Sequence, residues 1–236
     1  MVIEHQRCIE ENVDLKEELL IGKGILWVLF WFGFMLLYTA LDVGVWRKIA
    51  PFYAKYLNLL SIILCMVVFL ILLTRENHFK INLFQNISLQ GILLAIGCAV
   101  LFYFILDKGL DPVFEKIFPA SEESYQQMLE SLGSSPVISL IRVCVLAPVI
   151  EEILMRGFLL DGLARNYGKV IALLVSAFFF ALLHFNMVQT LSAFICGIVL
   201  GLLYLHTGSI FCCMLAHIGY NFTSYIAMIL QMYSKQ

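Results

Sequence analysis

Charged residues are scarce in this chain. Asp, Glu, Lys and Arg make up 14% of its 236 residues, whereas 61% are hydrophobic. An ordinary soluble domain is about 25% charged and about 45–50% apolar. Together with a mean hydropathy of +0.91, this composition predicts an integral membrane protein. The net charge of −2 gives no argument for nucleic-acid binding, and no stretch matches a zinc finger or a glycine-rich phosphate loop.

Paired cysteines and a cleavable signal peptide are also missing. The seven cysteines form no Cys-X-X-Cys pair, and an odd count without loop pairs does not predict a disulfide framework. We interpret six of them, inside apolar stretches, as small core residues. The first apolar run starts near Gly24 and is too long for the h-region of a signal peptide, so we interpret it as the first membrane helix.

Long apolar stretches make up most of the chain. A membrane helix needs about 20 apolar residues, and this rule predicts about seven spans: 24–42, 57–74, 90–106, 136–162, 169–185, 189–205 and 209–230. The predicted fold is all-α, a polytopic transmembrane helix bundle in which residues 24–236 form a single membrane domain.

Two polar segments predict additional interfacial helices. Residues 1–23 form an acidic leader whose apolar residues recur at roughly helical spacing, which indicates a solvated or interfacial helix. Residues 107–135 carry two apolar stripes with i, i+3, i+4 spacing, one at 113–118 and one at 125–132. We expect both stripes to form helices on the membrane surface.

Polar side chains interrupt three of the apolar stretches. A charged group at membrane depth costs about 2.5–3.5 kcal/mol on insertion scales, so such groups are usually functional. Carboxylates, imidazoles and an amide are also the parts needed for hydrolytic chemistry. The candidate catalytic residues are Glu151, Glu152, Arg156, His184, His217 and Asn221.

Helix geometry predicts that these residues meet. With a rise of about 1.5 Å per residue, Glu151, His184, His217 and Asn221 lie between about 12 and 22 Å from the same membrane face. They therefore share the middle of a hydrocarbon core about 30 Å thick. Glu152 and Arg156 are i, i+4 neighbours on one helix face, as are His217 and Asn221.

Each residue also has a structural interpretation. Glu152 and Arg156 can be interpreted as a purely structural ion pair. Asn221 can be interpreted as a partner in an interhelical hydrogen bond, and Phe180 as a core residue. Pro148 removes one backbone hydrogen bond and should leave a carbonyl free about one turn earlier. The combination of all these groups favours a functional site, because Glu151 is not needed for the Glu152–Arg156 ion pair.

At these residues the chain resembles the CAAX protease and bacteriocin-processing (CPBP) family of membrane-embedded endopeptidases. The stretch Glu151-Glu152-Ile153-Leu154-Met155-Arg156 resembles its EExxxR motif, Phe180 to His184 its FxxxH motif, and His217 to Asn221 its HxxxN motif. The resemblance covers residues 136–225. Met155 stands where the family often has an aromatic residue.

The resemblance implies a role for each position. Glu151 would be the general base that activates water, with help from His184. His217 and Asn221 would stabilise the oxyanion, and Glu152 and Arg156 would hold the site. Zinc remains an alternative with Glu151, His184 and His217 as ligands, since these are zinc-binding residue types, although the chain has no HExxH motif.

We therefore expect an intramembrane endopeptidase that cuts a peptide or membrane-protein substrate by glutamate-activated water. Peptide maturation, bacteriocin self-immunity and regulated proteolysis are the family's bacterial roles, and the compact loops favour a bacterial plasma membrane. The alternatives are a non-catalytic immunity or scaffold protein and a proton-coupled transporter, although the chain has no visible repeat of its span pattern. Membrane lipid is the other expected partner, and the sequence does not determine the oligomeric state.

Overall fold

The computed structural model describes residues 19–120, 123, 127, 132–133 and 135–234. Within these ranges the secondary structure is helical, and no β-strand occurs. The prediction of an all-α bundle is confirmed. An interfacial helix was predicted for the leader, residues 1–23, of which residues 1–18 lie outside the described part of the chain.

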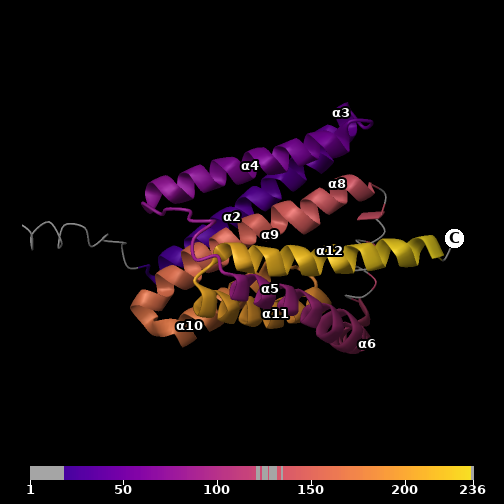
Figure 1. The fold of residues 1–236 in the computed structure, drawn as a ribbon. Coiled ribbons are helices and arrows are strands. Elements are labelled where there is room, and N and C mark those ends of the chain that lie inside the picture. The colour runs from indigo at the N-terminus through magenta and orange to yellow at the C-terminus, as the bar shows by residue number, and fades with distance from the viewer. Residues whose placement is uncertain (1–18, 121–122, 124–126, 128–131, 134, 235–236) are drawn as a thin grey trace, which may run out of the picture.

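The first two long helices lie side by side as a hairpin (Figure 1), and aromatic side chains pack between them. Phe69 is fully buried, and the centroid of its ring lies 5.0 Å from that of Trp31 and 5.9 Å from that of Trp27. The hairpin comprises α2 (Ile21–Leu41), the π-helical η1 (Asp42–Trp46), α3 (Arg47–Ile49) and α4 (Ala54–Glu76).

The next helix runs without a break from Leu89 to Ile117. Ser88 caps its start, since its side chain accepts a hydrogen bond from the Gly91 amide. Its parts are α5 (Leu89–Phe102), η2 (Tyr103–Leu110) and α6 (Asp111–Ile117). The apolar stripe at 113–118 was predicted to form a helix on the membrane surface. It is helical as far as Ile117, in α6, and η2 joins it without a break to α5. Most of the stripe at 125–132 lies outside the described residues.

A long helix between the hairpin and the remaining helices carries Glu151, Glu152 and Arg156. It comprises α8 (Pro136–Leu140), η3 (Ile141–Leu146), α9 (Ala147–Glu152), η4 (Ile153–Leu160) and the first part of α10 (Asp161–Leu182). Gly168 breaks α10 with a positive φ of 79°, a conformation that glycine adopts readily. The chain therefore turns back after Tyr167 and runs towards Phe180.

Two further helices complete the bundle. In α11 (Met187–Thr207) the Asn186 side chain caps the first turn, and Gly208 ends the helix in the left-handed conformation (φ 65°). The chain then forms α12 (Ile210–Ser234). In Figure 1, α5, α11 and α12 lie together on the side of the long helix that faces away from α4.

Five described helical segments are long and apolar enough to cross a membrane: Ile21–Ile49, Ala54–Glu76, Leu89–Ile117, Met187–Thr207 and Ile210–Met232. The two remaining predicted spans, 136–162 and 169–185, fall short for different reasons. The first carries four charged residues between positions 142 and 156, and the second ends at Leu182, soon after the break at Gly168.

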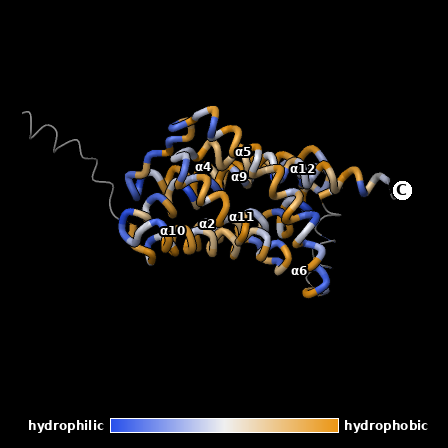
Figure 2. The backbone as a smooth tube through the Cα atoms, turned by 60° about the horizontal axis from the view of Figure 1, so that its bottom comes forward, coloured by the Kyte–Doolittle hydropathy of each residue, from blue (hydrophilic) through white to orange (hydrophobic). Residues whose placement is uncertain are grey.

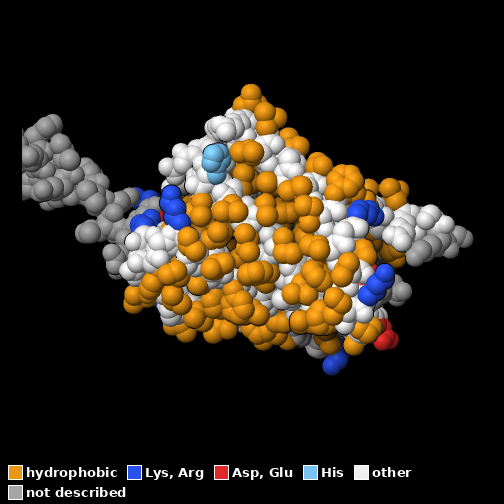
Figure 3. All heavy atoms as spheres, turned by 90° about the horizontal axis from the view of Figure 1, so that it is seen from below, with side chains coloured by type: hydrophobic (Ala, Val, Ile, Leu, Met, Phe, Trp, Pro, Cys, Tyr) orange, Lys and Arg blue, Asp and Glu red, His pale blue; other side chains and the backbone are white. Residues whose placement is uncertain are grey.

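The surface agrees with a membrane location. Hydrophobic backbone positions extend along the helices in Figure 2. In Figure 3 hydrophobic side chains cover the middle of the visible face, whereas Lys and Arg gather towards its two ends. This arrangement matches an apolar lipid core between two polar membrane surfaces. The protein is therefore an integral membrane protein.

Candidate active site

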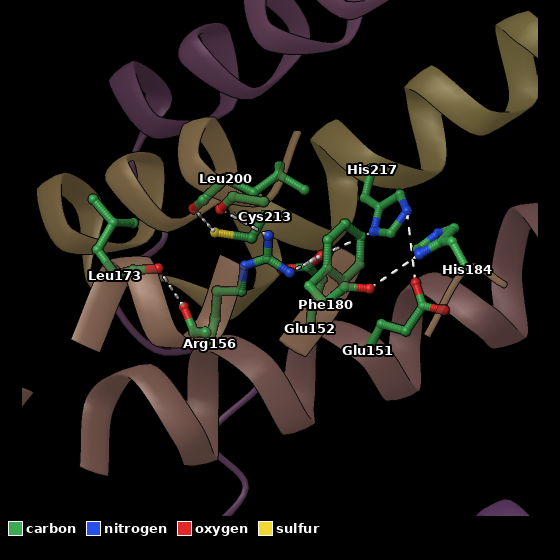
Figure 4. Close-up of polar contacts among 11 residues, drawn as sticks. Glu151, Glu152, Arg156, Leu173, Phe180, His184, Leu200, Cys213 and His217 are labelled. Atoms are coloured by element: carbon green, nitrogen blue, oxygen red, sulfur yellow. Dashed lines mark hydrogen bonds and ion pairs between the residues drawn. The ribbon is translucent and has the colours of Figure 1, made fainter. Parts of the chain in front are cut away.

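Glu152, Arg156 and His217 form a buried polar cluster where α9, η4 and α12 meet (Figure 4). The Glu152 side chain is 0% exposed, and its Oε1 accepts hydrogen bonds from Arg156 Nη1 at 3.0 Å and from His217 Nδ1 at 2.8 Å. A carboxylate oxygen only accepts, so Nδ1 carries the proton in this bond. The negative charge of Glu152 is thus balanced by Arg156 and shared with His217.

Arg156 also contacts two other helices, α10 and α11. Its Nη2 donates to the Gly197 carbonyl on α11 at 3.2 Å, and its guanidinium lies 4.7 Å from the centre of the Phe180 ring on α10. A Cβ atom at Gly197 would approach Ala177 Cα to 3.0 Å, so glycine permits the close helix contact that brings this carbonyl within reach. A charge with this many partners is tolerated in a low-dielectric interior.

Glu151 differs from its neighbour in exposure and partners. Its side chain is 15% exposed, and its Oε2 lies 3.8 Å from His217 Nε2, which is beyond direct hydrogen-bond distance. His217 therefore lies between the two acids, with Nδ1 bonded to Glu152 and Nε2 facing Glu151. Glu151 is the carboxylate of the pair that retains access to a small reactant.

His184 lies at the end of α10, beside Glu151 and His217 in Figure 4. Its Nδ1 is 3.0 Å from the Phe180 carbonyl, a bond in which Nδ1 must donate. The neutral ring then has an unprotonated Nε2 that can accept a proton. The Phe180 ring contacts both imidazoles edge to face, with centroid distances of 5.1 Å to His184 and 5.6 Å to His217.

Asn221 lies one turn beyond His217 on α12, and its described partner is Val143 rather than a member of the cluster. Its Nδ2 donates to the Val143 carbonyl at 2.9 Å. In η3 the Ala147 amide bonds to the Arg142 carbonyl in an i→i−5 pattern, so residue 148 would bond to Val143. Pro148 has no amide hydrogen, and Asn221 takes up the carbonyl that Pro148 leaves free.

The family comparison covers this segment. Residues 133–223 match the family described as Type II CAAX prenyl endopeptidase Rce1-like. The CPBP resemblance is confirmed. No curated protein and no solved structure matches the chain. All six candidate catalytic residues lie within the matched segment, which is the part of the chain that supports a protease of the CAAX type.

Two acids outside the matched residues 133–223 also reach into the bundle, and the sequence interpretation missed them. Asp107 in η2 accepts hydrogen bonds from Tyr220 and Ser224 on α12, and Asp111 in α6 accepts one from Ser192 on α11. Their i, i+4 spacing on a membrane helix was the available signal. It was missed because residues 107–135 were interpreted as a surface connection.

The candidate zinc ligands have suitable chemistry but do not assemble as a metal site. Both imidazoles bond through Nδ1, as metal-binding histidines often do through one ring nitrogen, and Nε2 of His217 faces Glu151. Among the residues that the structure describes, however, no three His, Cys, Asp or Glu side chains are grouped closely enough to hold a metal ion. No step below is derived through a metal.

Proposed function

We propose that the protein is an intramembrane endopeptidase in which Glu151 activates water for attack on a peptide bond. The observation that carries this proposal is the division of labour between adjacent acids. Glu152 is fully buried and committed to Arg156 and His217, whereas Glu151 is partly exposed and lies beside an imidazole. A carboxylate in a low-dielectric site is a stronger base than in water, which suits this chemistry.

In the proposed reaction, Glu151 accepts a proton from a water molecule as the water oxygen bonds to the scissile carbonyl carbon. His184, with Nε2 unprotonated, accepts a hydrogen bond from the same water and orients it. The carbonyl oxygen becomes an oxyanion. When the C–N bond breaks, the proton held by Glu151 passes to the leaving nitrogen, so the products are a carboxylic acid and an amine and Glu151 is restored.

Two groups on α12 are suited to stabilise the oxyanion. Because Glu152 engages His217 Nδ1–H, Nε2 is the ring nitrogen of His217 left to face the oxyanion, and it donates a hydrogen bond when it carries a proton. Asn221 has a second Nδ2–H besides the one bonded to Val143. Loss of one oxyanion donor typically lowers kcat by about 10²–10³, and we expect Asn221→Ala to do so.

The substrate class follows from the position of the site. The cluster lies within the helix bundle, so the scissile bond belongs to a peptide or membrane-protein segment that enters from the bilayer or its surface. The compact loops favour the bacterial members of the family, in a plasma membrane. Peptide maturation, bacteriocin self-immunity and regulated proteolysis are the proposed roles.

The experiment compares purified parental protein with Glu151→Gln and His184→Ala in cleavage of a synthetic tail peptide in detergent micelles. Glu151→Gln should lower kcat by at least about 10³, because removing a member of a catalytic base system typically costs this much. Glu76→Gln is the matched control, since Glu76 is exposed at the end of α4. Cleavage at the parental rate by both site variants would refute the proposal.

The main alternative is a non-catalytic immunity or scaffold protein with the same fold. The Glu152–Arg156–His217 cluster favours this alternative, because its contacts also have a structural role: they link α9 and η4 to α12. This alternative predicts that Glu151→Gln keeps the cellular phenotype while the protein accumulates normally in the membrane. Loss of the phenotype at normal accumulation supports the peptidase.

A further inference from the structure

A cavity lies away from the acids and imidazoles of the candidate active site, at one end of the bundle. Its volume is about 450 Å³, and its walls come from the loop between α4 and α5, from η4 and α10, and from the junction of α11 and α12. Glu151, His184, His217 and Asn221 do not line it. The cavity is therefore separate from the candidate active site.

The walls of this cavity carry an excess of positive charge. Lys80 comes from the loop, and Arg165 and Lys169 come from the two sides of the break at Gly168. Asp161 is the only acid among the lining residues, and its Oδ2 pairs with Arg165 Nη1 at 3.0 Å. Three cations against one acid leave a formal charge of +2, which favours an anionic ligand.

Neutral donors and apolar side chains complete the lining. Asn82, Gln85 and Asn86 contribute amides from the loop, which can donate to phosphate oxygens. Phe79, Leu205 and Ile210 add an apolar wall. A cavity lined by cations, amides and apolar groups suits an amphiphile with a phosphate head.

The cavity is also at the right level in the membrane for such a ligand. The membrane-spanning segments end at Glu76 and Thr207 and begin at Leu89 and Ile210, all next to the cavity lining. Helix ends mark the polar surface of the bilayer, where lipid phosphates lie. Lys and Arg gather at the ends of the visible face in Figure 3.

We propose that this cavity binds the phosphate headgroup of an anionic phospholipid, with Lys80 and Lys169 as the main charged contacts. Bound lipid would link the loop between α4 and α5 to α10, two segments that lie on either side of the α11–α12 junction. This site is independent of the peptidase proposal, because none of its lining residues belongs to the proposed reaction.

The test measures lipid binding to the purified full-length protein by native mass spectrometry. The probes are dioleoyl phosphatidylglycerol, which is anionic, and dioleoyl phosphatidylcholine, which is zwitterionic. The parental protein should bind the anionic lipid about tenfold more tightly. The double variant Lys80→Gln/Lys169→Gln should weaken that binding by about 10- to 30-fold, since each basic residue near a membrane surface contributes about 1 kcal/mol.

The matched control is Lys48→Gln/Lys55→Gln, which removes the same charge from exposed positions at the other end of the α2–α4 hairpin. It should bind the anionic lipid as the parental protein does. Equal loss in both double variants, or no loss in Lys80→Gln/Lys169→Gln, would overturn the site. In a further arm, soluble glycerol phosphate replaces the lipid. Binding as tight as that of the lipid would overturn the lipid as the source and keep the phosphate site.

Discussion

Two arginine–carboxylate pairs on the long helix have the same geometry and opposite surroundings. Glu152–Arg156 and Asp161–Arg165 are both i, i+4 pairs with an N–O distance of 3.0 Å. The side chains of the first pair are at most 1% exposed, whereas those of the second are 38% and 33% exposed. The same local spacing thus produces a buried structural unit in one place and a solvated surface pair in the other.

The difference shows that a charged side chain inside the bundle needs protein partners in place of water. Water can solvate Asp161 and Arg165, so their pairing contributes little. Glu152 and Arg156 lack that solvation, and His217, the Gly197 carbonyl and the Phe180 ring replace part of it. Glu152 Oε2 and Arg156 Nε are buried without a described hydrogen-bond partner. We infer that this compensation allows a second acid, Glu151, to lie in the same region with a partly open side chain.

The same contrast separates the α2–α4 hairpin from the helices that carry the site. The hairpin helices meet the length and hydropathy requirements for crossing a membrane and pack through aromatic rings such as Phe69. The long helix and the second part of α10 do not meet them, although they carry Glu151, Arg156 and His184. Their place in the bundle depends on contacts with other helices rather than on their own hydrophobicity.

The largest expected effect is that of Arg156→Met, which leaves Glu152 buried without its countercharge. Removing one partner of a buried pair typically costs about 3–5 kcal/mol. We expect the free energy of unfolding in mixed micelles to fall by this amount and the peptidase rate to fall with it. A loss below about 1 kcal/mol would show that the pair is solvated in the membrane.

The double variant Glu152→Gln/Arg156→Met sharpens this result. Removing both charges eliminates the unpaired carboxylate, so the double variant should be more stable than Arg156→Met alone. Strict additivity of the two single variants in a double-mutant cycle would contradict the coupling that their contact implies.

A smaller effect is expected at Asp107, which ties η2 to α12. Asp107→Leu removes the acceptor of the Tyr220 and Ser224 hydroxyls. Interhelical hydrogen bonds in membranes contribute about 0.6 kcal/mol on average and up to about 1.7 kcal/mol, so we expect a loss of about 1–3 kcal/mol by thermal unfolding. Asp107→Asn keeps one acceptor oxygen and should lose less; equal losses would assign the effect to the charge.

Phe69→Leu tests the hairpin without touching the polar cluster. A hydrophobic swap in a core usually costs less than about 1.5 kcal/mol, and we expect about 1 kcal/mol here because Phe69 is fully buried among aromatic rings. The rate per folded molecule should stay at the parental value in the peptide assay. A tenfold change in kcat would mean that hairpin and site are more closely coupled than their contacts indicate.

The smallest effect is expected for Arg165→Met, the exposed counterpart of Arg156→Met. Exposed i, i+4 pairs contribute about 0.3–0.5 kcal/mol, so the unfolding midpoint should hardly move. A cost similar to that of Arg156→Met would remove the distinction between the two pairs.

Sequence reasoning succeeded where one element carried the whole signal. Apolar runs predicted the all-α membrane bundle, and Pro148 predicted the free carbonyl that Asn221 now occupies. It predicted a helix at 113–118 but did not show that η2 joins this helix to the preceding one, because residues 107–109 are polar or glycine. It missed Asp107, whose partners Tyr220 and Ser224 lie more than a hundred positions away.

The sequence by itself determined that this protein lies in a membrane and which types of reactive group it carries. Hydropathy and side-chain chemistry are properties of single residues and short segments. Only the tertiary structure decided that Glu152 is bonded to Arg156 and His217 and that Glu151 stays partly exposed. Glu151 and Glu152 are chemically identical neighbours, and they differ only because α10, α11 and α12 close around one of them. That difference arises from burial and from contacts between distant helices, and neither property is local to the sequence.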